Sequence, residues 1–188
     1  YDSDPNSWRT RYVGEALQNA FSLSTYGFDH IIGNCNSAPA WLKTNGQHND
    51  GGTLIANGES EFSEFLVAFL AGMESRYGIE VTAISPTNEP DYEVSYESMN
   101  TTPSELSSIL INLNARLSNS GLDHINIVSP ECFRVESQNS STSATNYINS
   151  MFNNSAVEEA VDIVGTHTYA DPNHNANWGA LKAASNGK

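Results

Sequence analysis

The chain has 188 residues, and its 8 Lys and Arg against 22 Asp and Glu give a formal net charge of −14. This balance argues against nucleic-acid binding and against docking on anionic membranes, because both need clustered basic residues. The apolar stretches are strand-sized, so no membrane insertion is expected. With 38% hydrophobic residues the chain is expected to fold as one domain. Its polar but weakly charged composition favours a secreted, extracellular protein.

Apolar periodicity, capping residues and turn residues predict an alternation of helices and strands along the chain. The clearest helix covers residues 59–77, where Phe and Leu recur at steps of three and four residues. Thr102 and Glu105 have the spacing of a capping box, which predicts a helix that begins at Pro103. In chain order, the predicted helices cover residues 6–23, 59–77, 103–120, 144–152 and 178–184, and the predicted strands cover residues 29–34, 79–85, 125–129 and 161–167.

The regular alternation predicts an α/β fold with a parallel sheet and right-handed crossovers. Polar and aromatic residues gather in the loops that follow the strands, in the segments NSAPAW, NEPDY, PECF and THTYADP. Such a distribution is typical of an α/β barrel, or of the crevice of an open α/β sheet. Four strands are predicted, whereas a closed (β/α)8 barrel needs eight strands and typically ~250 residues. The chain is therefore either a small open sheet or part of a larger barrel.

The strongest local signal for chemistry is the segment SPTNEPDY, residues 85–92, directly after a predicted strand. At the carboxyl end of a strand, Glu89 is well placed to act as a general acid. Its neighbour Asn88 can hydrogen-bond a sugar hydroxyl, a contact that tightens in a glycosidic transition state. The alternative is a solvated glutamate in a turn bracketed by prolines.

Several segments in order resemble glycoside hydrolase family 30, which includes endo-xylanases, β-1,6-glucanases and glucosylceramidases. They are NSAPAWLKTNG (36–46), GGTL (51–54), AISPTNEPDY (83–92), YES (96–98), SPE (129–131) and GTHTY (165–169). The resemblance spans about residues 7–188. It implies a (β/α)8 TIM barrel of which residues 1–188 are the central portion, with barrel strands three to six present and the first two and last two missing.

The resemblance implies that Glu89 is the acid/base residue and that Glu131, at the end of the fifth barrel strand, supports residues that touch the substrate. The residues that it places against the substrate are Asn88, Trp41, Tyr92, His167 and Tyr169. Two of these roles have alternatives. Trp41 could instead plug the top of the barrel, and His167 could instead orient its neighbours.

The activity implied is that of a retaining glycoside hydrolase on a β-linked polysaccharide, with xylan favoured over β-1,6-glucan. The family's nucleophile is a Glu on the seventh barrel strand, and no residue of this sequence matches it. We therefore expect that the nucleophile lies outside the chain, that the missing barrel segments are its partners, and that the isolated polypeptide is insoluble or inactive. The alternative is a non-catalytic carbohydrate-binding or structural protein derived from such a barrel.

No cofactor or metal is expected. His167, Asp171 and His174 lack a recognised spacing of metal ligands. Cys35 and Cys132 would lie near the ends of next-nearest strands, ~9 to 10 Å apart, which exceeds the separation that a disulfide bridges. We therefore expect buried free thiols.

Overall fold

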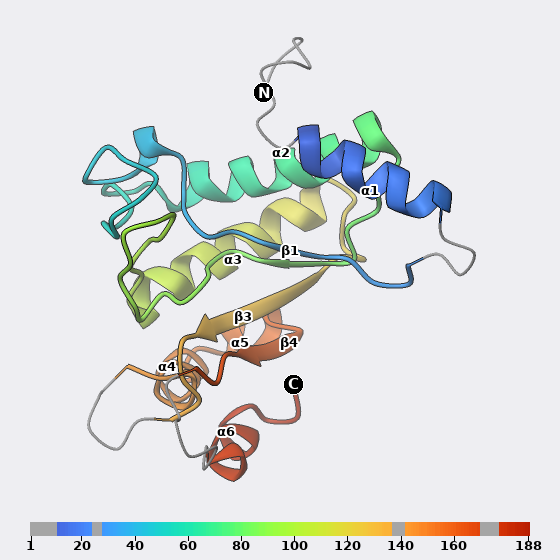
Figure 1. Cartoon of the computed structure of the whole chain (residues 1–188). Helices are drawn as coiled ribbons and strands as arrows, with labels where there is room; N and C mark the ends of the chain where they lie inside the picture. Colours follow the sequence, from blue (N-terminus) through green and yellow to red (C-terminus); the bar gives the residue numbers. More distant parts are fainter. Residues whose placement is uncertain (1–10, 24–27, 137–141, 170–176) are drawn as a thin grey trace.

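The computed structural model describes residues 11–23, 28–136, 142–169 and 177–188 (Figure 1). The elements in chain order are α1 (Arg11–Leu23), β1 (Ile32–Asn34), the 3-10 helix η1 (Ala40–Leu42), α2 (Glu59–Tyr77), β2 (Ala83–Ser85), α3 (Pro103–Asn119), β3 (Asn126–Cys132), α4 (Ala144–Met151), α5 (Ser155–Ala160), β4 (Ile163–Thr166) and α6 (Trp178–Ala184). In this part of the chain, no helix is long and apolar enough to span a bilayer.

The predicted alternation of helices and strands is confirmed, and the differences lie at the element ends. Helices α2 and α6 have the predicted bounds, whereas β1 and β2 have three residues each and are shorter than predicted. Strand β3 continues past the predicted end to Cys132. Helix α5 was not predicted, because its six residues are too few to show a helical period. Residues 6–10 of the first predicted helix lie outside the described residues.

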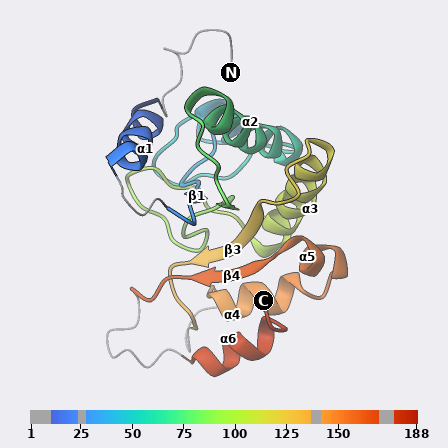
Figure 2. The same cartoon turned by 90° about the vertical axis from the view of Figure 1, so that its right-hand side faces the viewer.

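The four strands form one parallel sheet in the order β1-β2-β3-β4. Ile32 pairs with Ala83, and Val128 pairs with Ile163. The helices form an arc around the strands when viewed as in Figure 2. The sheet and its helices have the arrangement expected for part of an α/β barrel, in which every strand ends at the same edge.

Helices α2 and α3 provide much of the core on the helix side of the sheet. The apolar stripe of α2 buries Phe62, Leu66, Leu70 and Met73, and α3 buries Leu106, Ile109, Leu110, Leu113 and Leu117. The predicted capping box is confirmed, because Thr102 accepts from the amide of Glu105 and the Glu105 carboxylate accepts from the amide of Thr102. Gly78 ends α2 with a φ of 65°, a backbone conformation that glycine adopts without steric cost.

The two faces of the sheet differ in burial. Ile84 and Ile127 face the helices and are each only 1% exposed. On the opposite face of the outer strands, Ile32 is 60% exposed and Ile163 is 41% exposed. The described residues therefore cover the helix side of the sheet and leave the other face open at β1 and β4.

Candidate active site

Glu89 follows β2 and its side chain is nearly buried. The backbone of Glu89 has a φ of 49°, in the left-handed region that non-glycine residues seldom occupy. Two hydrogen bonds hold this conformation: the Glu89 amide donates to the Glu131 carbonyl at 2.8 Å, and the Tyr92 amide donates to the Glu89 carbonyl at 2.9 Å. A non-glycine residue held in such a conformation suggests a function for its side chain.

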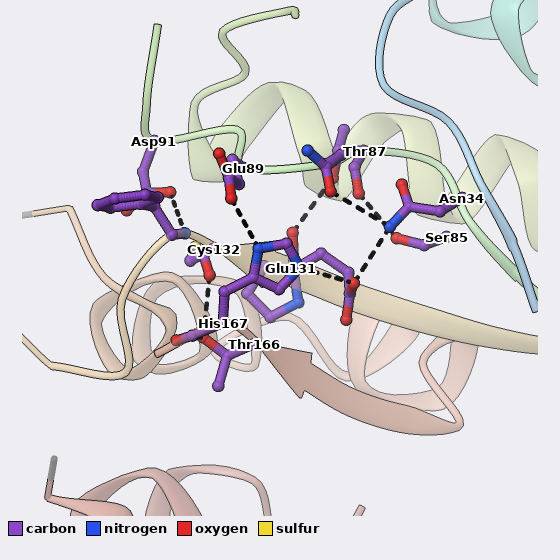
Figure 3. A network of polar contacts seen from close by, with 12 residues as sticks. Asn34, Ser85, Thr87, Glu89, Asp91, Glu131, Cys132, Thr166 and His167 are labelled. Atoms are coloured by element: carbon purple, nitrogen blue, oxygen red, sulfur yellow. Dashed lines mark hydrogen bonds and ion pairs between the residues drawn. The ribbon is translucent and has the colours of Figure 1, made fainter. Parts of the chain in front are cut away.

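His167 lies one residue past β4, with its ring between two carboxylates (Figure 3). Its Nδ1 atom lies 2.8 Å from Oε1 of Glu89, and its Nε2 atom lies 3.4 Å from Oε2 of Glu131. The backbone of His167 is held as well, because its amide donates to the carbonyl of Cys132 at 2.8 Å. His167 therefore connects the carboxylates that follow or end two neighbouring strands.

Glu131 belongs to β3, at an irregularity in its pairing with β4 between Pro130 and Cys132. Its φ of 58° is also in the left-handed region. The Nδ2 atom of Asn34, the last residue of β1, donates to Oε2 of Glu131 at 3.2 Å and to Oδ1 of Asn88 at 3.4 Å. The network thus includes residues from all four strands or from the positions that follow them. Asn34 was not predicted as a site residue, although its place at the end of a predicted strand was a usable signal.

A second group of contacts surrounds Asp91, two residues after Glu89. Oδ1 of Asp91 accepts from the Phe133 amide at 2.7 Å, while Oδ2 is buried without a hydrogen-bond partner among the described residues. Burial raises the pKa of Asp91, and burial also raises the pKa of the Cys132 thiol well above its usual value. These buried groups are suited to holding the loop against β3, and a raised pKa disfavours the thiolate form of Cys132.

Cys35 and Cys132 are both free thiols, and Cys35 is partly buried. The Cys35 thiol donates to the carbonyl of Ser37 at 3.3 Å, and burial raises its pKa to about 12. Across the described ranges, no group of three His, Cys, Asp or Glu side chains is placed to hold a metal ion. Asp171 and His174, which were considered as ligands with His167, lie outside the described residues.

An aromatic cluster adjoins the carboxylate network. Tyr92 stacks on Phe133 with ring centroids 4.2 Å apart and an interplanar angle of 11°. Tyr169 lies 5.7 Å from Phe133 and meets the ring of His167 edge-on at 5.2 Å. Tyr92 is 40% exposed and Tyr169 is 70% exposed, so their surfaces are open to a ligand. Phe133 was missed, although it belongs to the strand-end segment PECF.

Trp41 stands apart from this cluster. It lies in η1, in the segment that follows β1, and its side chain is 60% exposed. Within the described residues no ring contact joins Trp41 to Glu89, Tyr92 or His167. The contacts of the described residues therefore bring together Glu89, His167, Tyr92 and Tyr169, and both roles expected for Trp41 stay predictions.

The arrangement gives Glu89 one occupied and one open carboxylate oxygen. His167 is the hydrogen-bond partner of Oε1, and Oε2 has no partner in the part of the chain that the structure describes. A sheltered carboxyl group with one open oxygen can exchange a proton with a bound ligand. The other carboxylate, Glu131, already contacts Asn34 and His167 and is less free to react.

Comparison with solved structures supports a barrel fold. The catalytic domain of a xylanase from Talaromyces cellulolyticus has a TM-score of 0.70 and 21% identity, and covers 90% of this chain and 38% of its own. A xylanase from Clostridium acetobutylicum has a TM-score of 0.71 and 24% identity, covering 91% and 41%. An endo-β1,6-glucanase has a TM-score of 0.77 and 15% identity, covering 100% and 40%. The chain thus spans about two fifths of the length of these structures.

The sequence matches the family model described as O-Glycosyl hydrolase family 30 over residues 6–172. The match includes all four strands and every residue of the carboxylate network. Because it covers most of the 188 residues, the chain belongs to O-glycosyl hydrolase family 30.

Proposed function

We propose that the chain provides the acid/base part of the active site of a retaining glycoside hydrolase that cleaves a β-linked polysaccharide. Glu89 donates its proton to the glycosidic oxygen as the bond to the anomeric carbon breaks. A nucleophilic carboxylate forms a bond to that carbon at the same time. Glu89 then takes a proton from the water that releases the sugar, with retention of configuration.

One observation supports this role above all others: Glu89 is sheltered, it is fixed through Oε1 by His167, and its Oε2 atom has no partner among the described residues. Proton transfer needs a carboxyl group in a defined orientation within reach of the leaving oxygen. A solvated glutamate in a turn would have neither the burial nor the histidine contact. The backbone hydrogen bonds of Glu89 add to this orientation.

The nucleophile is proposed to lie outside the 188 residues. A retaining mechanism places the two carboxyl groups about 5 to 5.5 Å apart, and the second one must be free to form a bond. Glu131 is engaged by Asn34 and His167. Since the chain spans about two fifths of the length of the structures that it resembles, we assign the nucleophile and the remaining strands to further segments of the same enzyme. The complete enzyme below means the chain together with those segments.

The substrate is proposed to be xylan. The exposed rings of Tyr92 and Tyr169 suit the apolar faces of successive pyranose units, and Trp41 offers a separate ring in the segment after β1. Two of the similar structures are xylanases, and a third is an endo-β1,6-glucanase. The two polymers should therefore be compared as substrates. Faster cleavage of β-1,6-glucan would replace xylan as the proposed substrate and would leave the proposed retaining mechanism unchanged.

The test is Glu89→Ala in the complete enzyme, assayed on xylan and on a dinitrophenyl β-xylobioside. Cleavage of xylan is expected to fall by about a hundredfold or more, because a general acid typically contributes 10²–10⁴. The dinitrophenyl substrate needs no acid, so its slow step becomes the attack of water. Added azide needs no base, and it should accelerate turnover and yield a β-glycosyl azide.

Glu80→Ala is the matched control. Glu80 also pairs with a histidine, at 3.8 Å from His124, but it is an exposed side chain away from the network. Near-normal xylan and glucan cleavage by Glu89→Ala, or no azide product, would reject the acid/base role. Glycan binding without any cleavage by the unmodified complete enzyme would favour the alternative of a carbohydrate-binding protein.

A further inference from the structure

Glu131 is held in place as firmly as Glu89, although the proposed reaction gives it no bond to make or break. Its side chain is 16% exposed, and Asn34 donates to its Oε2 atom. The Glu131 carboxylate also rests against Gly165 of β4, where a Cβ atom would overlap its Oε1 atom. The Glu131 carboxylate is therefore held in one position by the hydrogen bond from Asn34 of β1 and by its packing against Gly165 of β4.

The partner that this position serves is His167. A carboxylate that contacts one ring nitrogen of a histidine restricts the orientation of the ring, and so it also fixes where the other nitrogen points. Oε2 of Glu131 faces Nε2 of His167, and the Nδ1 atom on the other side of the same ring faces Oε1 of Glu89 (Figure 3). The orientation of the His167 ring is therefore set by Glu131, and the orientation of the Glu89 carboxyl group is set by His167.

The geometry points to Glu131 as a positioning residue that acts on Glu89 through His167. This inference rests on the proposed function and adds a residue to it. When Glu89 has given its proton to the leaving oxygen, its carboxylate stays beside Nδ1 of His167 at 2.8 Å, and Glu131, 3.4 Å from Nε2, keeps the ring in that position. No bond to carbon forms at Glu131. Its removal should weaken proton donation by Glu89 rather than the binding of substrate.

The test is the ratio of two rates in the complete enzyme: kcat/KM for a xylo-oligosaccharide, whose leaving group needs a proton, and kcat/KM for a dinitrophenyl β-xylobioside, whose leaving group does not. A partly unfolded variant lowers both rates equally, so the ratio responds to acid catalysis alone. Glu131→Gln is expected to lower the ratio about tenfold, in the range found when the partner that orients a functional ligand is lost. Glu80→Gln should leave it within roughly twofold.

Three results would overturn the inference. The first is an unchanged ratio in Glu131→Gln. The second is an equal collapse of both rates in a Glu131→Gln variant that is as fully folded as the unmodified enzyme by urea denaturation, with azide unable to restore turnover, which would make Glu131 the nucleophile. The third applies if Glu131→Gln gives no folded protein: Glu131→Asp, which withdraws the carboxylate by one methylene, should then lower the ratio, and a normal ratio would count against the role. Glu89→Gln, measured in parallel, separates the two proposals, because a normal ratio there would reject the proposed function itself.

Discussion

Two loop regions at the same edge of the sheet are built in different ways. Around Glu89, single residues from the ends of all four strands form one network, in which His167 contacts two carboxylates. The segment that follows β1 instead bonds to the neighbouring loop, with the buried Lys43 donating to the Ser98 carbonyl at 2.6 Å and to the Ser37 hydroxyl at 3.0 Å. Ser98 also accepts from the Gly51 amide at 2.9 Å. The first region orients one carboxyl group, and the second supports a loop.

Gly165→Ala should have the largest effect, because it displaces the Glu131 carboxylate in the region around Glu89. The new Cβ atom would overlap the Glu131 carboxylate and lie 2.8 Å from Cγ1 of Val128. Since a displacement of about 1 Å can cost about 10²-fold in rate, xylan cleavage by the complete enzyme should fall about a hundredfold. Gly179→Ala is the control, because its nearest neighbour, Oδ1 of Asn177, is 3.4 Å away. Normal cleavage by Gly165→Ala would show that the position of Glu131 is unimportant.

Lys43→Met should destabilise the segment that follows β1 and leave acid catalysis by Glu89 unchanged. The substitution keeps the length of the side chain but leaves the Ser98 carbonyl and the Ser37 hydroxyl without their charged donor. The free energy of unfolding should fall by about 2 kcal/mol, measured by urea denaturation. The exposed Lys182→Met should change it little. The ratio of rates on the two classes of leaving group should stay normal, and a fall in that ratio would break the distinction between the two regions.

The aromatic residues test the same difference between the region around Glu89 and the segment after β1, with smaller expected effects. Loss of a stacking ring costs about 0.5–1.5 kcal/mol, so Trp41→Ala and Tyr169→Ala should each raise KM for xylan a few-fold. Trp41 has no described contact with the cluster, so the two effects should add in the double variant. Phe133 and Tyr169 are 5.7 Å apart, so Phe133→Ala and Tyr169→Ala should not add. Strong coupling between Trp41 and Tyr169 would place them in one site.

The sequence was sufficient to predict the parallel α/β sheet, because α2 and α3 have long apolar stripes and clear end signals. It also placed Glu89, Glu131 and His167 at strand ends. The contacts between these residues could not be predicted, because they depend on the register in which neighbouring strands pair. Asn34 lies 97 residues before Glu131 in the chain, and His167 lies 78 residues after Glu89.

Gly165 and Phe133 show the same limit of sequence reasoning. In the sequence, Gly165 is one small residue in a strand, and its importance depends on the Glu131 side chain that crosses it from β3. Phe133 belongs to the aromatic cluster only because the loop after β2 stacks Tyr92 on its ring. The resemblance makes Trp41 a substrate residue, and this role stays a prediction, because the described contacts do not connect its exposed ring to the network. Side chains were predictable where a local pattern fixed them, and not where a neighbouring strand did.

Asp91→Asn should have the smallest effect, a change in how stability depends on pH. Burial raises the pKa of Asp91 above 3.8, its ordinary value, so the folded protein holds this proton more tightly than the unfolded chain does. Between about pH 3.8 and the folded pKa, the native state therefore binds more protons than the unfolded state does. The free energy of unfolding falls as pH rises through that window. Asn at this position cannot titrate, although its oxygen can still accept from the Phe133 amide.

The measurement is the free energy of unfolding of Asp91→Asn minus that of the unmodified complete enzyme, in urea between about pH 4 and pH 7. This difference should increase with pH, whatever its absolute sign, and its slope should stay below about 1.4 kcal/mol per pH unit, the limit for one proton. The exposed Asp123→Asn should give no such slope. A flat difference for Asp91→Asn would mean that the carboxyl group is solvated, and that the loop after β2 is held less closely against β3 than its contact with Phe133 indicates. The orientation of Glu89, two residues earlier in that loop, would then depend more on its own backbone hydrogen bonds and on its contact with His167.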